Sequence, residues 1–179
     1  MDFALAQRLQ SSLVPSDRVV FAKMQAGEPL ADILDGLLRA VEAECGGDIM
    51  ASILLLEGDH LRHGAAPSLP DAYNEAIDGI QIGQGVGSCG TAAYLGHPVY
   101  VTDIATDPLW KDFKDLAAEH GLGACWSTPI EGEDRAILGT FAIYHRTRRS
   151  PTSDELDAIR LISDSVSLAI QRHRATTGR

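Results

Sequence analysis

The residues best suited to chemistry lie in one glycine-rich segment, residues 83–96, which holds five of the seventeen glycines and one cysteine. Ser88 is a favourable helix N-cap and Gly96 a favourable helix stop, so we expect a short helix between them. Three backbone amides would then be unpaired donors at the positive end of that helix, and the glycines would let a small ligand approach them. These amides belong to Cys89, Gly90 and Thr91.

This pattern is open to three interpretations. It fits a receptor for a small ligand, and it also fits a reactive thiol, because a helix N-terminus favours the thiolate form of Cys89. The third interpretation is structural: the glycines shape a tight turn and Cys89 is a small buried apolar residue.

The other residues that could bind a metal or form disulfides are widely spaced. The three cysteines, Cys45, Cys89 and Cys125, form no Cys-x-x-Cys pair, and the six histidines form no His-x-x-x-His pair. We find no signal peptide and no apolar run long enough to span a bilayer. We therefore expect a cytoplasmic protein with reduced thiols, no metal site and no membrane partner.

The overall charge argues against nucleic acid as a partner. The 179 residues include 25 acidic and 15 basic residues, which gives a formal charge of -10. Most of the surface would repel a phosphate backbone. The length fits one domain with a substantial hydrophobic core.

Apolar periodicity predicts the elements that must position the glycine-rich segment. The first half is expected to contain helix 2–14 ended by Pro15, helix 30–45, strands 49–56 and 61–65, and helix 71–77. The second half is expected to contain strand 98–104, helix 108–120 capped by Asp107, strands 124–131 and 136–145, and a long helix that begins at a Thr152–Glu155 capping box.

Two hairpins that bracket helical insertions favour an α+β fold with one antiparallel sheet, because the strands are not separated by regular crossover helices. We divide the chain into an N-terminal helical arm (1–26), one domain (27–175) whose last helix covers 153–174, and a short tail (176–179).

Several ordered motifs resemble the GAF domain family over residues 27 to about 173. They are Gly85-Val86-Gly87-Ser88-Cys89-Gly90-Thr91-Ala92, Val99-Tyr100-Val101-Thr102-Asp103-Ile104, Asp107-Pro108-Leu109-Trp110, Ala124-Cys125-Trp126-Ser127-Thr128-Pro129-Ile130 and Leu138-Gly139-Thr140-Phe141-Ala142-Ile143-Tyr144. The chain looks most similar to GAF modules of bacterial sensor kinases and cyclic-dinucleotide signalling proteins. The resemblance implies a five- or six-stranded antiparallel sheet, with the N- and C-terminal helices on one face and a ligand pocket roofed by short helices on the other.

Strand alternation then indicates which side chains face the implied pocket. Cys125, Ser127 and Pro129 should share a face with Thr140, Ala142 and Tyr144, while Trp126, Ile130, Phe141 and Ile143 should pack on the long helices. With the roof elements added, the candidate ligand-binding residues are Ser88, Cys89, Gly90, Thr91, Tyr94, Trp110, Phe113, His120, Cys125, Ser127, Thr140 and Tyr144.

One alternative is a thiol enzyme similar to free methionine-sulfoxide reductases, which are GAF proteins. Their cysteine-bearing glycine block is similar to the one around Cys89. Their His-x-Ala-Cys-Asp segment has no counterpart in residues 112–123, and this chain offers Cys125, Ala142 and Tyr144 where those enzymes place carboxylates. We assign no catalytic residue on this basis.

The cofactors familiar in GAF domains also find little support. A bilin would favour a cysteine followed by histidine, haem would need an axial ligand for which only His120 is a candidate, and the cyclic-nucleotide signature is not recognisable. The cofactor therefore stays unknown.

We expect a sensory or regulatory module that binds a small ligand, with a module that only dimerises as the other alternative. Ligand binding or oxidation of Cys89 would shift the roof helix 108–120 and change the packing of the terminal helices. The apolar seam from Leu156 to Ile170 is long enough to contact both the sheet and a second copy, so a homodimer and a separate signalling output partner are expected.

Overall fold

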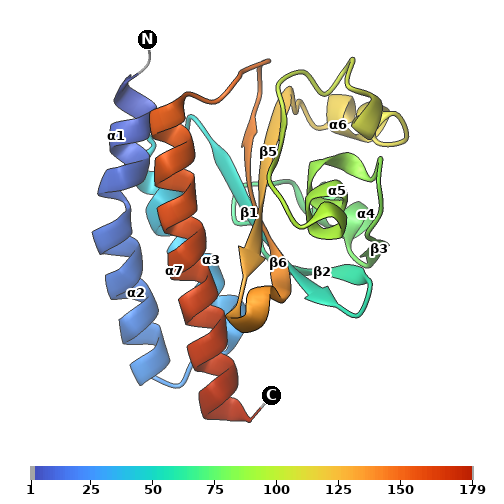
Figure 1. Ribbon diagram of the computed structural model, residues 1–179. Coiled ribbons are helices and arrows are strands. Elements are labelled where there is room, and N and C mark those ends of the chain that lie inside the picture. Colours follow the sequence, from blue (N-terminus) through green and yellow to red (C-terminus); the bar gives the residue numbers. More distant parts are fainter. Residues whose placement is uncertain (1–2, 179) are drawn as a thin grey trace.

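A six-stranded antiparallel sheet separates two layers of helices (Figure 1). The computed structural model describes residues 3–178, so the first residue of the predicted helix 2–14 and the last of the predicted tail lie outside the described residues. The strand order is β3-β2-β1-β6-β5-β4. The strands are β1 (Met50–Glu57), β2 (His60–Ala65), β3 (Ile80–Gln81), β4 (Val99–Val101), β5 (Ala124–Glu131) and β6 (Ile137–His145). This confirms the predicted α+β class; the two-residue strand β3 was not predicted.

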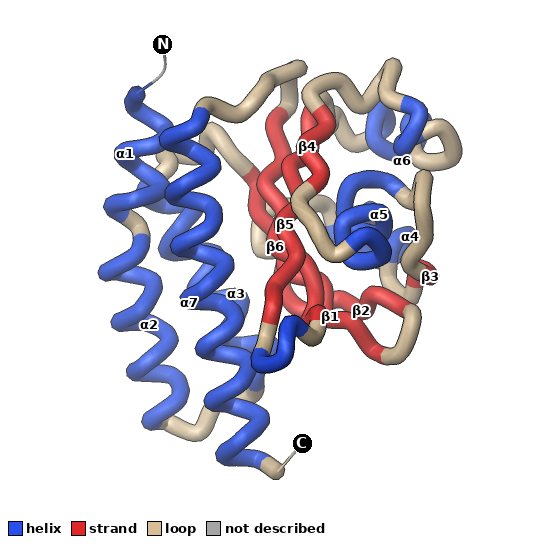
Figure 2. Tube along the Cα trace, in the orientation of Figure 1, coloured by secondary structure: helices blue, strands red, loops and turns tan. Residues whose placement is uncertain are grey.

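The long helices cover one face of the sheet (Figure 2). They are α1 (Phe3–Ser11), α2 (Leu13–Gln25), α3 (Leu30–Glu44) and α7 (Ser153–Thr177). The apolar stripe of α3 is fully buried there from Leu34 to Val41, together with Leu5 and Leu9 of α1, so the N-terminal helices share the core of the domain. Within residues 3–178, no helix has both the length and the apolar character needed to cross a membrane.

The ends of these helices differ from prediction in two places. Pro15 does not end a helix: it is the third residue of α2, where its missing N–H falls among the first-turn amides that have no partner within the helix. The break comes instead at Ser12, whose hydroxyl donates to the Leu9 carbonyl at 2.6 Å. At the other end, the Thr152–Glu155 capping box is present, and α7 extends three residues beyond the predicted end.

Short helices cover the opposite face and form a second apolar cluster. They are α4 (Asp71–Ile77), α5 (Gly87–Leu95), the 3₁₀ turn η1 (Pro108–Trp110) and α6 (Lys114–Glu119). The predicted continuous helix 108–120 is wrong, because η1 and α6 are separate. The Asp107 carboxylate accepts from the Leu109 amide at 2.9 Å and closes a tight turn, which directs the Trp110 ring inward.

The β5–β6 hairpin sets the two faces of the sheet. It turns at η2 (Glu133–Arg135), and its register places Cys125 opposite Tyr144, Ser127 opposite Ala142 and Pro129 opposite Thr140. The alternate residues Trp126, Ile130, Phe141 and Ile143 lie in the core beneath the long helices. The predicted division of side chains between the two faces is therefore confirmed.

Candidate functional site

A small apolar pocket lies between the sheet and the short helices. Six of the predicted site residues line it, namely Ser88, Cys89, Gly90, Trp110, Phe113 and Tyr144. The space open to the centre of a water molecule is about 30 Å³, which is enough for a few waters. The pocket in this state is therefore too small for a nucleotide or a tetrapyrrole.

Two tyrosines form a neutral polar group in the pocket wall. The hydroxyls of Tyr73 and Tyr144 are 3.2 Å apart, and the rings meet edge to face. Burial raises the pKa of both tyrosines well above the usual value, so both phenols stay protonated. The lining holds no Asp, Glu, Lys, Arg or His, so Cys89 is the lining side chain that can carry a charge near neutral pH.

Ser88 does not cap α5, which corrects the prediction from sequence. The helix begins at Gly87 with Val86 in the N-cap position and no side-chain cap. The Ser88 hydroxyl instead accepts from Trp110 Nε1 and donates to the Cys125 carbonyl, both at 3.0 Å. These tertiary hydrogen bonds replace the local cap and join the roof turn η1 to strand β5 through α5.

Because α5 starts at Gly87, the backbone amides without a partner in the helix are not all the ones predicted from the sequence. The first-turn donors are those of Gly87, Ser88 and Cys89, whereas Gly90 and Thr91 lie within the helical hydrogen-bond ladder. Gly87 has a φ of +58° and packs under the Trp110 ring, and a Cβ on Gly90 would lie 2.6 Å from the Val86 side chain. Glycine is therefore required at both positions, one for its backbone conformation and one for close packing.

Cys89 lies at the centre of a buried group of sulfur and hydroxyl atoms. The Cys125 thiol, followed by the hydroxyls of Ser127, Thr140 and Tyr144, lowers the pKa of Cys89 to about 7. Burial raises the pKa of Cys125 well above its usual value. The arrangement favours a thiolate on Cys89 and a neutral thiol on Cys125.

The remaining predicted residues lie at different distances from the pocket. Cys125, Ser127 and Thr140 are fully buried behind Cys89 and do not line the pocket. Thr91 is turned toward its own helix, where its hydroxyl donates to the Gly87 carbonyl. His120 packs edge to face on Tyr73 at 5.8 Å but is not among the lining residues.

Tyr94 lies outside the pocket, with 58% of its surface exposed. It is on the C-terminal half of α5, whereas the pocket contacts only the first turn of that helix.

Six lining residues were not anticipated from the sequence: Leu54, Tyr73, Ile77, Ile80, Val86 and Gly87. Leu54 pairs with Thr140 across β1 and β6, so strand alternation would have identified it once the sheet order was known. Tyr73 and Ile77 lie on α4, which was predicted correctly, but their inward direction depends on how that helix packs.

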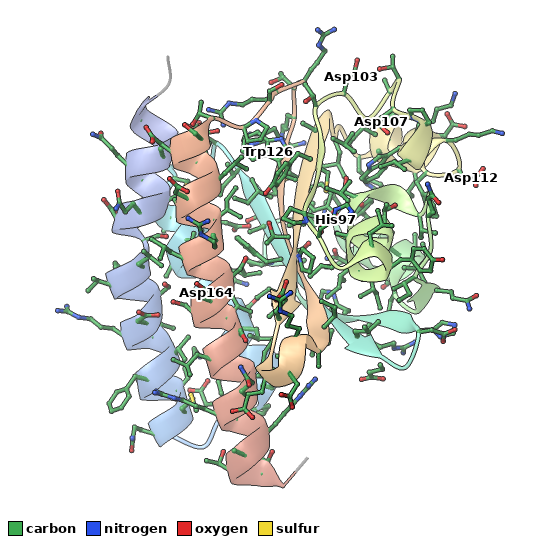
Figure 3. The ribbon with its side chains drawn as sticks, viewed as in Figure 1. His97, Asp103, Asp107, Asp112, Trp126 and Asp164 are labelled. Carbon is green, nitrogen blue, oxygen red and sulfur yellow. The ribbon has the colours of Figure 1, made fainter. Side chains whose placement is uncertain are left out.

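A chain of contacts leads from the pocket wall to the helical layer. Trp126 follows Cys125 on β5 and points to the opposite face, as Figure 3 shows between the sheet and α7. Its Nε1 donates to the Arg149 carbonyl at 3.0 Å. The Arg149 guanidinium in turn pairs at 2.6 Å with Glu155, a fully buried residue in the first turn of α7. Groups at the pocket and at the start of α7 are therefore physically connected.

Comparison of the sequence with models of known protein families identifies the family of this chain. A family model described as GAF domain matches residues 27–171. The chain belongs to the GAF domain family. The match begins after α2, so α1 and α2 lie outside it although their side chains enter the same core. The family resemblance inferred from the motifs is confirmed.

Known proteins similar to this GAF domain include a sensor. The methyl sulfide methyltransferase-associated sensor of Methanosarcina acetivorans is 34% identical over 96% of this chain, which spans 17% of that relative's length. A protein described as a GAF sensor from Burkholderia vietnamiensis has a TM-score of 0.75 at 16% identity, with 95% of this chain and 98% of that one covered. Free methionine-R-sulfoxide reductase from Neisseria meningitidis has a TM-score of 0.72 at 16% identity, with 96% and 93% covered. These two structures support the fold alone.

Proposed function

We propose that this GAF domain is a cytoplasmic sensory module that binds a small molecule and transmits the binding event to its terminal helices. Three facts support the proposal: membership of the GAF family, the similarity to a sensor that is much longer than this chain, and a pocket on the sheet face opposite the long helices. The output would lie in a separate signalling protein or domain.

The chemistry of the pocket limits the class of ligand. Its walls are apolar and aromatic, with a few hydroxyls, one thiol and the first-turn amides of α5. Such a site suits a small uncharged or singly anionic molecule oriented by those amides. A ligand that needs more room than this pocket offers would press on the roof, where Trp110 and Phe113 are the large lining side chains that it would move.

The single observation that carries the proposal is a series of hydrogen bonds that leads from the pocket to the start of α7. Moving Trp110 would break its bond to Ser88, which also holds the Cys125 carbonyl on β5. The next residue, Trp126, is hydrogen-bonded to the segment that leads into α7. Ligand binding at the roof would thereby change the packing at the start of α7.

Thermal unfolding tests ligand binding. The protein is screened with small neutral metabolites and with small singly charged anions, namely short-chain carboxylic acids, hydroxy acids and 2-oxo acids. We expect at least one class to raise the Tm, because a ligand that binds only the folded state stabilises it. Tyr144→Ala should remove that rise, and the matched control Tyr100→Ala, outside the pocket, should keep it. A panel with no effect on the wild-type Tm would contradict the proposal.

The reductase alternative is not supported by the pocket lining. No carboxylate is present there to balance the ammonium group of an amino acid substrate. We therefore do not propose this activity.

We also propose that two copies associate through the terminal helices. Four large apolar side chains are exposed on the outer surface of α2 and α7: Val14, Phe21, Leu161 and Leu168. Phe21 and Leu168 both line a shallow groove between these helices. Exposed apolar side chains on neighbouring helices are typical of an interface.

Light scattering after size exclusion tests this association. The double variant Phe21→Ser/Leu168→Lys should be monomeric at concentrations where the wild type is a dimer. Tyr94→Ser is the matched control, because Tyr94 is equally exposed but lies on the other face of the sheet. A wild type that is monomeric at high concentration, or a double variant that remains dimeric, would contradict the proposal.

A further inference from the structure

Two free cysteines meet beneath the pocket. Cys89 is in the first turn of α5, directly after Ser88, whose hydroxyl donates to the Cys125 carbonyl on β5 at 3.0 Å. The Cys125 thiol is also the largest cause of the lowered pKa of Cys89. Cys89 lines the pocket and keeps 8% of its surface exposed, whereas Cys125 is fully buried behind it. A molecule in the pocket can therefore reach Cys89 directly and Cys125 only by way of Cys89.

Two buried hydroxyls near this pair lack an acceptor. Ser127 Oγ and Thr140 Oγ1 are on residues with no exposed surface, and neither has a hydrogen-bond partner at ordinary distance among the described residues. Both act on the Cys89 sulfur and favour its ionised form. Leaving a buried hydroxyl unpaired is unfavourable, so each such group requires an explanation. Their placement suits an acceptor formed on Cys89, either its thiolate or an oxygen bonded to its sulfur.

The size of the pocket selects the reagent that can reach this sulfur. With about 30 Å³ open to the centre of a water molecule, the pocket admits hydrogen peroxide readily and an aromatic hydroperoxide or a bulky disulfide far less readily. Because no Lys, Arg or His lines the pocket, the Cys89 thiolate is supported by hydroxyl donors and by the N-terminus of a nine-residue helix.

We propose that Cys89 and Cys125 form a redox-active pair that reacts with hydrogen peroxide. The Cys89 thiolate attacks one peroxide oxygen, the O–O bond breaks, and the departing hydroxide takes a proton to become water. The sulfur is oxidised to a sulfenic acid whose oxygen is placed among the Ser127, Thr140 and Tyr144 hydroxyls. As the Cys125 thiol gives up its proton, its sulfur attacks the Cys89 sulfur and the S–O bond breaks. The leaving hydroxide takes that proton to become a second water, and the disulfide forms.

The disulfide would link α5 covalently to β5. These are the same two elements that the Ser88 hydrogen bond to the Cys125 carbonyl already joins, so oxidation would act on the route from the pocket to α7. The reaction does not depend on a metabolite in the pocket, so it adds a redox input to the proposed sensor.

Mass spectrometry of the reduced protein tests the pair. With equimolar hydrogen peroxide, the wild type should lose about 2 Da, and peptide mapping should join Cys89 to Cys125. Cys125→Ser should stop at the sulfenic acid, which dimedone traps on Cys89, and Cys89→Ser should not react at the same peroxide concentration. Cys45→Ser is the matched control and should behave as the wild type, because burial raises the pKa of Cys45 to about 12 and it lies in the other core.

Two rate measurements test the hydroxyls and the pocket size. Thr140→Val should slow oxidation about tenfold, the effect of one lost hydrogen bond to the reacting anion. Cumene hydroperoxide should react with the wild type far more slowly than hydrogen peroxide. Wild-type Cys89 oxidised no faster than Cys45, or a disulfide that includes Cys45, would overturn the proposal without any variant having to fold. Failure of the metabolite screen would leave these results unchanged, so the two proposals fail separately.

Discussion

His145 makes the stability of this domain depend on pH in a way that can be calculated. It is the last residue of β6, only 5% exposed, and its ring packs on Trp126 with centroids 4.4 Å apart. Burial, followed by the charge of Arg149, lowers the pKa of His145 to about 4 from an ordinary 6.5, while Asp48 opposes this weakly. Its Nε2 has no hydrogen-bond partner among residues 3–178. The folded protein therefore strongly favours neutral His145.

The direction in which stability changes with pH follows from proton linkage. As the pH falls below 6.5, the unfolded chain binds a proton at this position while the folded protein does not, so unfolding becomes easier. The stabilisation is complete above pH 6.5, and its loss ends near pH 4. With these two pKa values, the free energy of unfolding should fall by about 2 kcal/mol between pH 7 and pH 5, out of a maximum near 3 kcal/mol.

Urea denaturation at pH 7 and pH 5 measures this effect. His145→Phe keeps a ring against Trp126 and removes the titrating group, so the pH dependence of the variant should be smaller than that of the wild type by about 2 kcal/mol. A change in packing would shift the stability of the variant equally at both pH values. The difference between the two proteins in how much the free energy of unfolding changes from pH 7 to pH 5 therefore reports the histidine alone. An equal change in the free energy of unfolding between pH 7 and pH 5 for the two proteins would refute the reasoning.

Three further predictions concern single side chains. Ser88→Ala should lower the free energy of unfolding in urea by about 2 kcal/mol, because it leaves Trp110 Nε1 and a buried carbonyl unpaired; a loss below about 0.5 kcal/mol would contradict the structure. Thr152→Ala should cost about 1 kcal/mol by the same assay, through loss of the α7 cap. Gly139→Ala should abolish the folded circular dichroism spectrum, because its Cβ would lie 2.0 Å from a strand carbonyl, whereas Gly83→Ala, with its closest contact at 3.3 Å, should fold.

Much of the fold was predictable because local patterns and tertiary packing agree. The apolar stripe of α3, the capping box at Thr152 and the alternation along β5 and β6 each identified an element and the face it buries. In each of these cases a periodic set of side chains meets a single surface, so the period alone is informative. Two of the errors occurred where another contact overrides a local preference: Ser88 bonds to Trp110 rather than to its own helix, and the Asp107 turn that directs the Trp110 ring inward interrupts the expected helix 108–120. The error at Pro15 was local, because proline is tolerated in the first turn of a helix.

The sequence by itself determined the family, which side chains face each side of the sheet, and the glycine-rich segment that surrounds Cys89. The tertiary structure alone decided that the pocket is small, that α4 supplies Tyr73 to its wall, and that Cys125, Ser127 and Thr140 gather behind Cys89. The physical reason is distance along the chain. The pocket wall joins residues from β1, α4, α5, η1 and β6, and no local pattern records how closely such distant segments pack.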